Sequence, residues 1–148
     1  MPPRSEIADF IESIPGNALL GLKVTQMGEG VGEVVLPWRD KVANHVGTVH
    51  AAALFGIADA ASGAALFAGL GDLALTVTPI ARGGEIRYSR PARGDITGRA
   101  RVPDQQVATI REELAAEGVS RPDVVVTMTD ADGAEVAEAT FHWRITVS

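Results

Sequence analysis

The chain has 148 residues, no cysteine, a formal net charge of −6 and 46% hydrophobic residues. This length predicts a single domain over residues 1–148, which can bury a core without disulfides. The acidic balance argues against a nucleic-acid binder, since such proteins usually carry a basic stripe. The absence of cysteine excludes disulfides, thiol catalysis and zinc–thiolate sites, and we assign no metal ligands.

A short amphipathic helix and a β-hairpin are expected first. Residues 4–14 form the helix, with Ser5 as its N-cap and Pro15-Gly16 as its stop. Its apolar positions are Ile7, Phe10, Ile11 and Ile14. Acidic residues stand where a secretory signal would have its apolar run, so we expect a cytoplasmic protein. Residues 23–38 predict two strands around Gly28-Glu29-Gly30, followed by a polar loop.

The most apolar stretch, residues 42–70, carries a single carboxylate, Asp59, near its middle. The stretch is long enough to span a bilayer. A carboxylate at the bilayer centre is costly, however, and alanine and glycine drive insertion only weakly. We therefore interpret residues 49–69 as a long helix in the core of a soluble domain, and expect no membrane partner.

On a helical period of 3.6 residues, this segment has two faces. A broad apolar face that suits a sheet comprises Leu54, Ile57, Ala61, Ala65 and Ala68. A narrow face of mostly small residues comprises Ala52, Phe55, Gly56, Asp59, Ser62, Gly63 and Leu66. A carboxylate on such a face is rarely left unpaired. Asp59 therefore either pairs with an arginine or caps a loop, or it acts as a general base or nucleophile in a cleft.

The remaining segments predict strands with one inserted helix. Residues 73–103 are strand-like, with a bulge at Gly83-Gly84, a turn over 90–95 and a strand over 95–102. Residues 104–118 predict a helix capped by Asp104 and Gly118, and residues 122–147 a hairpin around a turn at 130–133. The order indicates an α+β fold, in which a largely antiparallel sheet of five to six strands surrounds the long helix.

The start of the long helix is a second candidate for chemistry. Free backbone N–H groups near His50 and Ala51 can polarise a carbonyl oxygen. Asn44 and His50, each taken alone, are explained equally well by loop and cap hydrogen bonds. Ala51 lies about 12 Å along the helix from Asp59, too far for one carbonyl to contact both. If both act, they come from different protomers of a two-fold dimer.

Two motifs then become recognisable. In "NHVGTVHAAALFGIAD" a glycine and a histidine follow the asparagine, and an aspartate stands nine residues after the histidine. This resembles hotdog-fold thioesterases of the phenylacetyl-coenzyme-A-thioesterase-like group, whose pattern is Asn-x-x-Gly-x-x-His-Gly-Gly followed by an acid. "RYSRPARGD" resembles a strand of the same family that ends Tyr-x-x-Pro-Ala-[Arg/Lys]-x-Gly. The element order agrees over nearly the whole chain, and the helix at 104–118 is similar to that of a poorly characterised branch.

The resemblance implies a hotdog fold and hydrolysis of an acyl-coenzyme-A thioester by a homodimer or a homotetramer built as a dimer of dimers. Coenzyme A is then part of the substrate, and no cofactor is implied. By the same resemblance, Asp59 activates water or is the nucleophile, and the Ala51 N–H polarises the carbonyl. Asn44 orients water or the thioester, and His50 supports the helix start.

The chain departs from the family at two places. Ala51-Ala52 replaces Gly-Gly, and Ala81 stands where the family often has a serine or threonine, so Thr78 and Ser62 are candidates to supply that hydroxyl. Arg90 and Arg93 suit coenzyme A phosphates, or they are ordinary surface residues. The candidate substrate-binding residues are Gly47, Phe55, Ser62, Thr78, Ala81, Arg90 and Arg93. The alternative function is a non-catalytic protein that binds an acyl ligand.

Overall fold

The computed structural model describes residues 4–148, in which one long helix is enclosed by an antiparallel sheet. The helices are α1 (Arg4–Ser13), α2 (Pro15–Leu20), α3 (Ala51–Leu70) and α4 (Asp104–Glu117), with 3₁₀ helices η1 (Asp40–Val42) and η2 (Gly71–Thr76). The strands are β1 (Lys23–Gly28), β2 (Val31–Leu36), β3 (Val77–Tyr88), β4 (Ile96–Arg101), β5 (Val119–Ser120), β6 (Asp123–Thr129) and β7 (Glu135–Val147). The expected α+β hotdog architecture is confirmed, although the described residues form seven strands rather than five or six.

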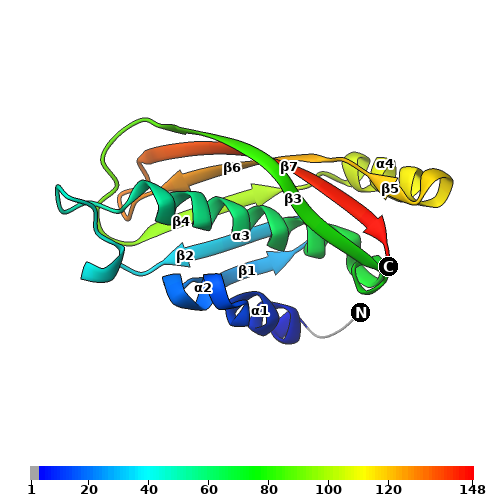
Figure 1. Cartoon of the computed structure of the whole chain (residues 1–148), viewed down its shortest axis with the longest axis horizontal. Coiled ribbons are helices and arrows are strands. Elements are labelled where there is room, and N and C mark those ends of the chain that lie inside the picture. The colour runs from blue at the N-terminus through cyan, green and yellow to red at the C-terminus, as the bar shows by residue number, and fades with distance from the viewer. Residues whose placement is uncertain (1–3) are drawn as a thin grey trace.

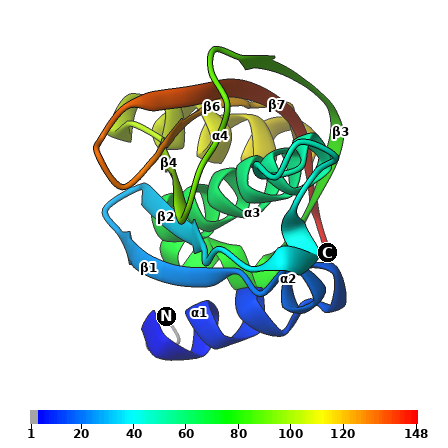
Figure 2. The ribbon, with the colours of Figure 1, turned by 90° about the vertical axis from the view of Figure 1, so that its left-hand side faces the viewer.

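The sheet order is β1-β2-β4-β6-β7-β3, and β5 pairs with β7 outside this path. Every pair is antiparallel. β3 and β1 therefore lie at opposite edges, although β3 is the first strand after the long helix (Figure 1). The end view shows the sheet curving around α3, with α1 and α2 lying along the side nearest β1 (Figure 2).

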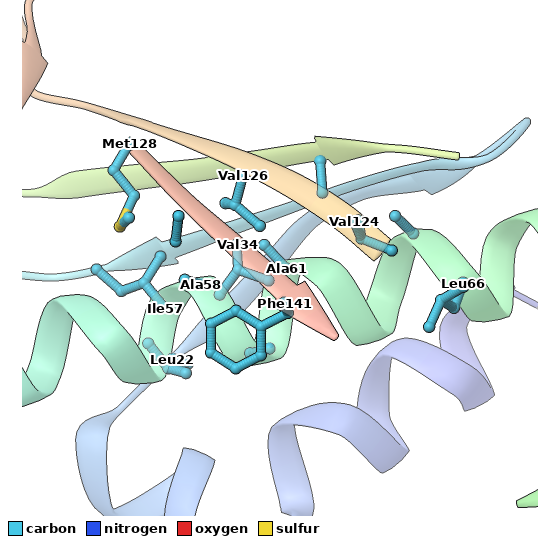
Figure 3. Close-up of a cluster of buried hydrophobic side chains, with 14 of the residues drawn as sticks. Leu22, Val34, Ile57, Ala58, Ala61, Leu66, Val124, Val126, Met128 and Phe141 are labelled. Carbon is cyan, nitrogen blue, oxygen red and sulfur yellow. The ribbon is translucent and has the colours of Figure 1, made fainter. Parts of the chain in front are cut away.

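The helix α3 packs closely on the sheet because glycines face it. A Cβ atom on Gly32 of β2 would stand 2.7 Å from the Ala61 carbonyl oxygen, and one on Gly98 of β4 would meet the Ile57 side chain. Of the broad face predicted for the helix, Leu54 and Ala65 are buried and Ala68 is only half-buried. At its centre, Ile57 and Ala61 are fully buried. Figure 3 shows apolar side chains of the sheet gathered around these two residues; among them are Val34, Val126, Met128 and Phe141.

The structure corrects several local expectations. Pro15 begins a second helix instead of only stopping the first, because proline is well suited to the first helical turn. Ser5 lies within α1 rather than before it. Asp104 makes no capping bond, and Pro103 holds the N-cap position of α4. The predicted narrow face of α3 is only partly open, since Ser62 and Leu66 are buried.

Other expectations for the later half of the chain are confirmed in whole or in part. A bulge is present in β3, but the register shifts between Ala81 and Gly83, so the extra residue is Arg82 and the predicted Gly83-Gly84 pair keeps regular partners. Gly118 ends α4 in the left-handed conformation with φ 73°. The segment Ala51–Thr76 is, within the described part of the chain, long and apolar enough to cross a membrane. Because this segment contains α3, the core helix enclosed by the sheet, its length and composition are no evidence of a membrane span.

Candidate functional site

The loop that leads into α3 is held in shape by the side chain of Asn44. Its Oδ1 accepts hydrogen bonds from the backbone N–H groups of Val46 and Thr48, both at 3.0 Å. Its Nδ2 donates to Thr48 Oγ1 at 2.7 Å and more weakly to the Val49 carbonyl at 3.4 Å. Gly47 sits at the turn with φ 81°, which glycine adopts without strain. Asn44 thus fixes the backbone that presents the helix start.

The first turn of α3 leaves one amide free. His50 is the N-cap, and its Nδ1 accepts a hydrogen bond from the Ala52 N–H at 2.9 Å, so Nε2 carries the ring proton of the neutral form. The His50 N–H donates to the Val42 carbonyl. Within residues 4–148, no acceptor meets the Ala51 N–H. This amide, at the positive end of the helix dipole, is therefore free to bind a carbonyl oxygen.

A cleft of about 290 Å³ opens beside this helix start, and we call it the helix-start cleft. It lies between the loop, the first turn of α3 and the segment after β3. The Val49 N–H donates to the Ala92 carbonyl at 2.8 Å, which holds the two walls together. Its lining residues are Asn44, Thr48, Val49, Ala51, Leu54, Tyr88, Ser89, Arg90, Pro91 and Ala92.

Asp59 lies two turns further along α3 and is half-buried. Among the described residues, no side chain or backbone donor meets its carboxylate, although the Ser62 hydroxyl donates to the Asp59 backbone carbonyl at 2.9 Å. Burial raises the pKa of the Asp59 carboxyl above its ordinary value. Neither arginine pairing nor loop capping accounts for Asp59 within the described chain, and a raised pKa is typical of a general base.

Asp59 lines a larger cavity of about 570 Å³, which we call the α1–α3 pocket. Its walls come from the two helices, from the start of β3 and from Trp143 of β7. Most of the lining is apolar, and Thr78 lies on the β3 side. The full set is Glu6, Ile7, Phe10, Ile11, Ile14, Asn17, Asp59, Ala60, Gly63, Ala64, Phe67, Ala74, Leu75, Val77, Thr78, Pro79 and Trp143.

Three of the four predicted catalytic residues fall in two separate cavities of one chain, and His50 lines neither. Ala51 and Asn44 line the helix-start cleft, whereas Asp59 lines the α1–α3 pocket. The helical rise separates Ala51 from Asp59 by about 12 Å. One substrate carbonyl cannot contact both groups within a single protomer, because reacting atoms stand about 3–3.5 Å apart.

The other predicted residues are distributed unevenly around these cavities. Arg90 lines the helix-start cleft, and Arg93 lies exposed in the same turn. Phe55 packs against Phe141, with ring centroids 4.9 Å apart, and lines neither cavity. Ala81 stands opposite Trp143 in the β3–β7 register, also outside both linings.

Ser62 and Thr78, the two candidate hydroxyls, differ in access. Ser62 is fully buried and accepts a hydrogen bond from Trp143 Nε1 at 3.0 Å in addition to the bond that it donates. Thr78 Oγ1 is exposed and lies 2.9 Å from Ser148 Oγ, and Thr78 lines the pocket that contains Asp59. Of the two, Thr78 is the hydroxyl that a ligand in this pocket can reach.

Sequence reasoning missed several residues of these cavities. Trp143 and the Phe10–Phe67 pair line the α1–α3 pocket, and Tyr88 OH reaches the Ala51 carbonyl at 3.4 Å. Helical spacing placed Phe10 on the core face of its helix, yet its side chain is 55% exposed. An apolar ring left open beside a cavity is a signal that only the packed structure gives.

A family model covers almost all of this architecture, since it matches residues 10–145. The chain belongs to the DUF4442 family. This family is described as a domain of unknown function. No curated protein matches the chain.

Solved structures place this DUF4442 chain among hotdog-fold proteins of the thioesterase-like group. A protein of unknown function from Pseudomonas aeruginosa, a "probable thioesterase", is 28% identical with a TM-score of 0.87 over 100% of this chain and 99% of that one. A putative thioesterase from Shewanella oneidensis is 16% identical, with a TM-score of 0.79 over 97% and 99%. The E. coli PaaI protein of the phenylacetic acid degradation operon is 17% identical, with a TM-score of 0.72 over 97% and 92%. The last two, at such identities, carry the fold alone.

Proposed function

We propose that this DUF4442 chain is an acyl-coenzyme-A thioesterase whose active site is shared between two protomers. The observation that carries this proposal is a pair of unsatisfied groups on one helix. The Ala51 N–H has no acceptor and the Asp59 carboxylate has no donor in the described chain, and each faces a different cavity. A second copy that runs antiparallel would bring each group to the other's cavity.

The exposed edge of the sheet supports such a pairing. β3 is an edge strand of 12 residues, and an edge strand presents unpaired N–H and C=O groups. Ile80 in this strand is 56% exposed, and pairing at this edge would help to cover it. Two β3 strands paired about a two-fold axis would set the α3 helices side by side. We therefore propose a homodimer, and a homotetramer as its further assembly.

In the proposed reaction, one protomer supplies Asp59 and its partner supplies the Ala51 N–H. In the proposed site, the Asp59 carboxylate of one protomer takes a proton from water, and the hydroxide attacks the thioester carbonyl carbon. The Ala51 N–H of the partner stabilises the oxyanion. The C–S bond then breaks, and the thiolate of coenzyme A leaves and takes up the proton. The products are a carboxylic acid and free coenzyme A. Coenzyme A is a compound of the cytoplasm, and we propose that the protein is located there.

The coenzyme A moiety is assigned to the helix-start cleft. Arg90 lines this cleft and Arg93 is exposed nearby, and both offer guanidinium groups that bind phosphate in a bidentate manner. Asn44 and Gly47 shape the loop of this half, and His50 fixes the first turn of α3. We propose that the Thr78 hydroxyl, which lines the pocket of Asp59 and lies 2.9 Å from Ser148 Oγ, also binds water beside Asp59 in place of the hydroxyl that Ala81 lacks.

The proposal is tested by measuring thiol release from a panel of acyl-coenzyme-A substrates. We expect Asp59→Asn to lower kcat by about 10²–10⁴, the usual contribution of a general base. Asp132→Asn, the same change in the exposed turn at 130–133, is the matched control. Equal rates for wild type and Asp59→Asn would refute the assigned role.

The second candidate function is a non-catalytic protein that binds an acyl thioester. Ala81 favours it, because no hydroxyl stands at this position of β3. Tight binding of acyl-coenzyme A by calorimetry, with no turnover of any panel substrate, would select this function over the first.

A further inference from the structure

The lining of the α1–α3 pocket follows α3 from Asp59 onward, and we call this stretch of the pocket the channel. Along α3 the lining residues run from Asp59 through Gly63 to Phe67, which corresponds to about 12 Å of helix. The helices α1 and α2 run in the opposite direction beside it. Leu20 lies against Gly56, near the start of α3, and Phe10 pairs with Phe67 near its end. A ligand that reaches Asp59 with its reacting atom therefore has a channel beyond it.

The end of this channel beside Phe67, which we call its far end, is lined by an aromatic wall of Phe10 and Phe67. Phe10 and Phe67 meet edge to face, with centroids 6.3 Å apart and an interplanar angle of 85°. Leu75 of η2, which is 66% exposed, lines the same pocket. Exposed apolar side chains gathered around a cavity mark a binding site more often than a free surface.

The middle of the channel is floored by small side chains. Gly63 is partly exposed there, whereas Ala60 and Ala64 are buried, and a Cβ atom on Gly63 would meet only Trp143, at 3.6 Å. That distance is an ordinary van der Waals contact, so one methyl group fits over Gly63 before Trp143 closes the space.

Two polar side chains of the pocket are already hydrogen-bonded within the chain. Asn17 is buried, and its amide donates to the Ile11 carbonyl within α1. Thr78 lies on the β3 wall and its hydroxyl pairs with Ser148. Along α3 beyond Asp59, the lining offers only aliphatic and aromatic carbon. Glu6, exposed on α1 one turn before Phe10, also lines the pocket and places a carboxylate near the far end.

We propose that this pocket binds an unbranched aliphatic acyl chain of medium length, and that the Phe10–Phe67 pair sets the longest chain accepted. This substrate class rests on the proposed function, which supplies the thioester beside Asp59. Binding should tighten about fourfold for each methylene buried (about 0.8 kcal/mol) until the chain reaches the aromatic wall.

The test measures both turnover and binding for each chain length. Butyryl, octanoyl, dodecanoyl, hexadecanoyl and phenylacetyl coenzyme A are hydrolysed in one series. Their thioether analogues, which cannot be hydrolysed, are titrated by calorimetry in the other. Phe67→Ala and Phe10→Ala open the far wall, Gly63→Val fills the middle, and Leu19→Ala is the control for an exposed apolar residue outside the pocket.

The expected result is a maximum at medium chain length for the wild-type protein. Phe67→Ala or Phe10→Ala shifts this maximum to longer chains, Gly63→Val weakens binding of all but butyryl, and Leu19→Ala leaves the profile unchanged. Two aromatic variants are used so that a loss of folding in one leaves the other informative. Chain-length-dependent binding that shifts in these variants supports the pocket even if no thioester is hydrolysed. Hydrolysis with an unshifted profile, or a preference for the phenylacetyl group, overturns it.

Discussion

Replacing Ala51 with proline removes the proposed oxyanion donor while leaving the helix in place. Ala51 is the first residue of α3, the position at which proline is favoured because its missing N–H has no helical acceptor. His50 before it has φ −62° and ψ 139°, the extended conformation that a residue preceding proline prefers. The Ala52 N–H still donates to His50, so the cap is retained. The substitution therefore changes one donor.

The size of the effect follows from the role of that donor. Loss of one oxyanion hydrogen bond costs about 10²–10³ in kcat, or about 3–4 kcal/mol of transition-state stabilisation. We expect kcat to fall by this factor with little change in KM, since the bond strengthens only as charge develops. The free energy of unfolding should change by less than about 1 kcal/mol. Ala51→Gly, which keeps the N–H, is the matched control for thiol release and thermal unfolding.

A mixed dimer separates a shared site from a site within one chain. Co-expressed Ala51→Pro and Asp59→Asn protomers form heterodimers in which one of two sites has both groups intact. Random pairing should restore about a quarter of wild-type activity if the halves come from different chains. Full activity of Ala51→Pro alone would refute the oxyanion role, and a mixture as inactive as its parents would refute the shared geometry.

Three further predictions concern stability. Asp59→Asn should raise the free energy of unfolding at pH 7 by about 1 kcal/mol, because it removes an unpaired half-buried carboxylate. Urea titration should show this gain begin to fall as the pH drops through the raised pKa of the folded state, and disappear below 3.8, the ordinary pKa of aspartate. The hydrogen bonds that the protonated His142 ring donates to Asp123 and then to Glu85 raise the pKa of His142. The stabilisation from this pairing is complete below 6.5, the ordinary pKa of histidine, and is lost as the pH rises through the raised pKa of the folded state. His142→Gln should therefore lower Tm more at about pH 5.5 than at about pH 9; an equal loss would contradict this pairing. Gly32→Ala should lower stability by about 3 kcal/mol, or Tm by about 10 °C, because the new Cβ meets the backbone of α3; an unchanged melting curve would show that the helix can move away.

Part of the candidate site could be predicted from the local sequence. The spacing from Asn44 through His50 to Asp59 predicted a loop, a helix start and a carboxylate on one helix, and the structure has all three. Helical rise is a local quantity, so the separation of Ala51 from Asp59 followed as well. The role of each residue in catalysis stays a prediction.

Long-range packing determined what local spacing could not. Ser62 appeared open on the narrow face of α3, but Trp143, 81 residues later, covers it and donates to its hydroxyl. Strand pairing likewise puts Asp123 and Glu85 on the two ring nitrogens of His142, each at 2.7 Å. Both contacts depend on the order of strands in the sheet.

The sequence by itself determined the elements of this protein: the long apolar helix, the strand-rich second half and the inserted helix α4 with its terminal glycine. These rest on periodicity and on local backbone preferences, which a short segment carries within itself. Only the tertiary structure decided which cavity each residue faces and that Phe10 and Phe67 meet at the end of a channel. A cavity is the space left after segments distant in the chain have packed together, so no single segment encodes it.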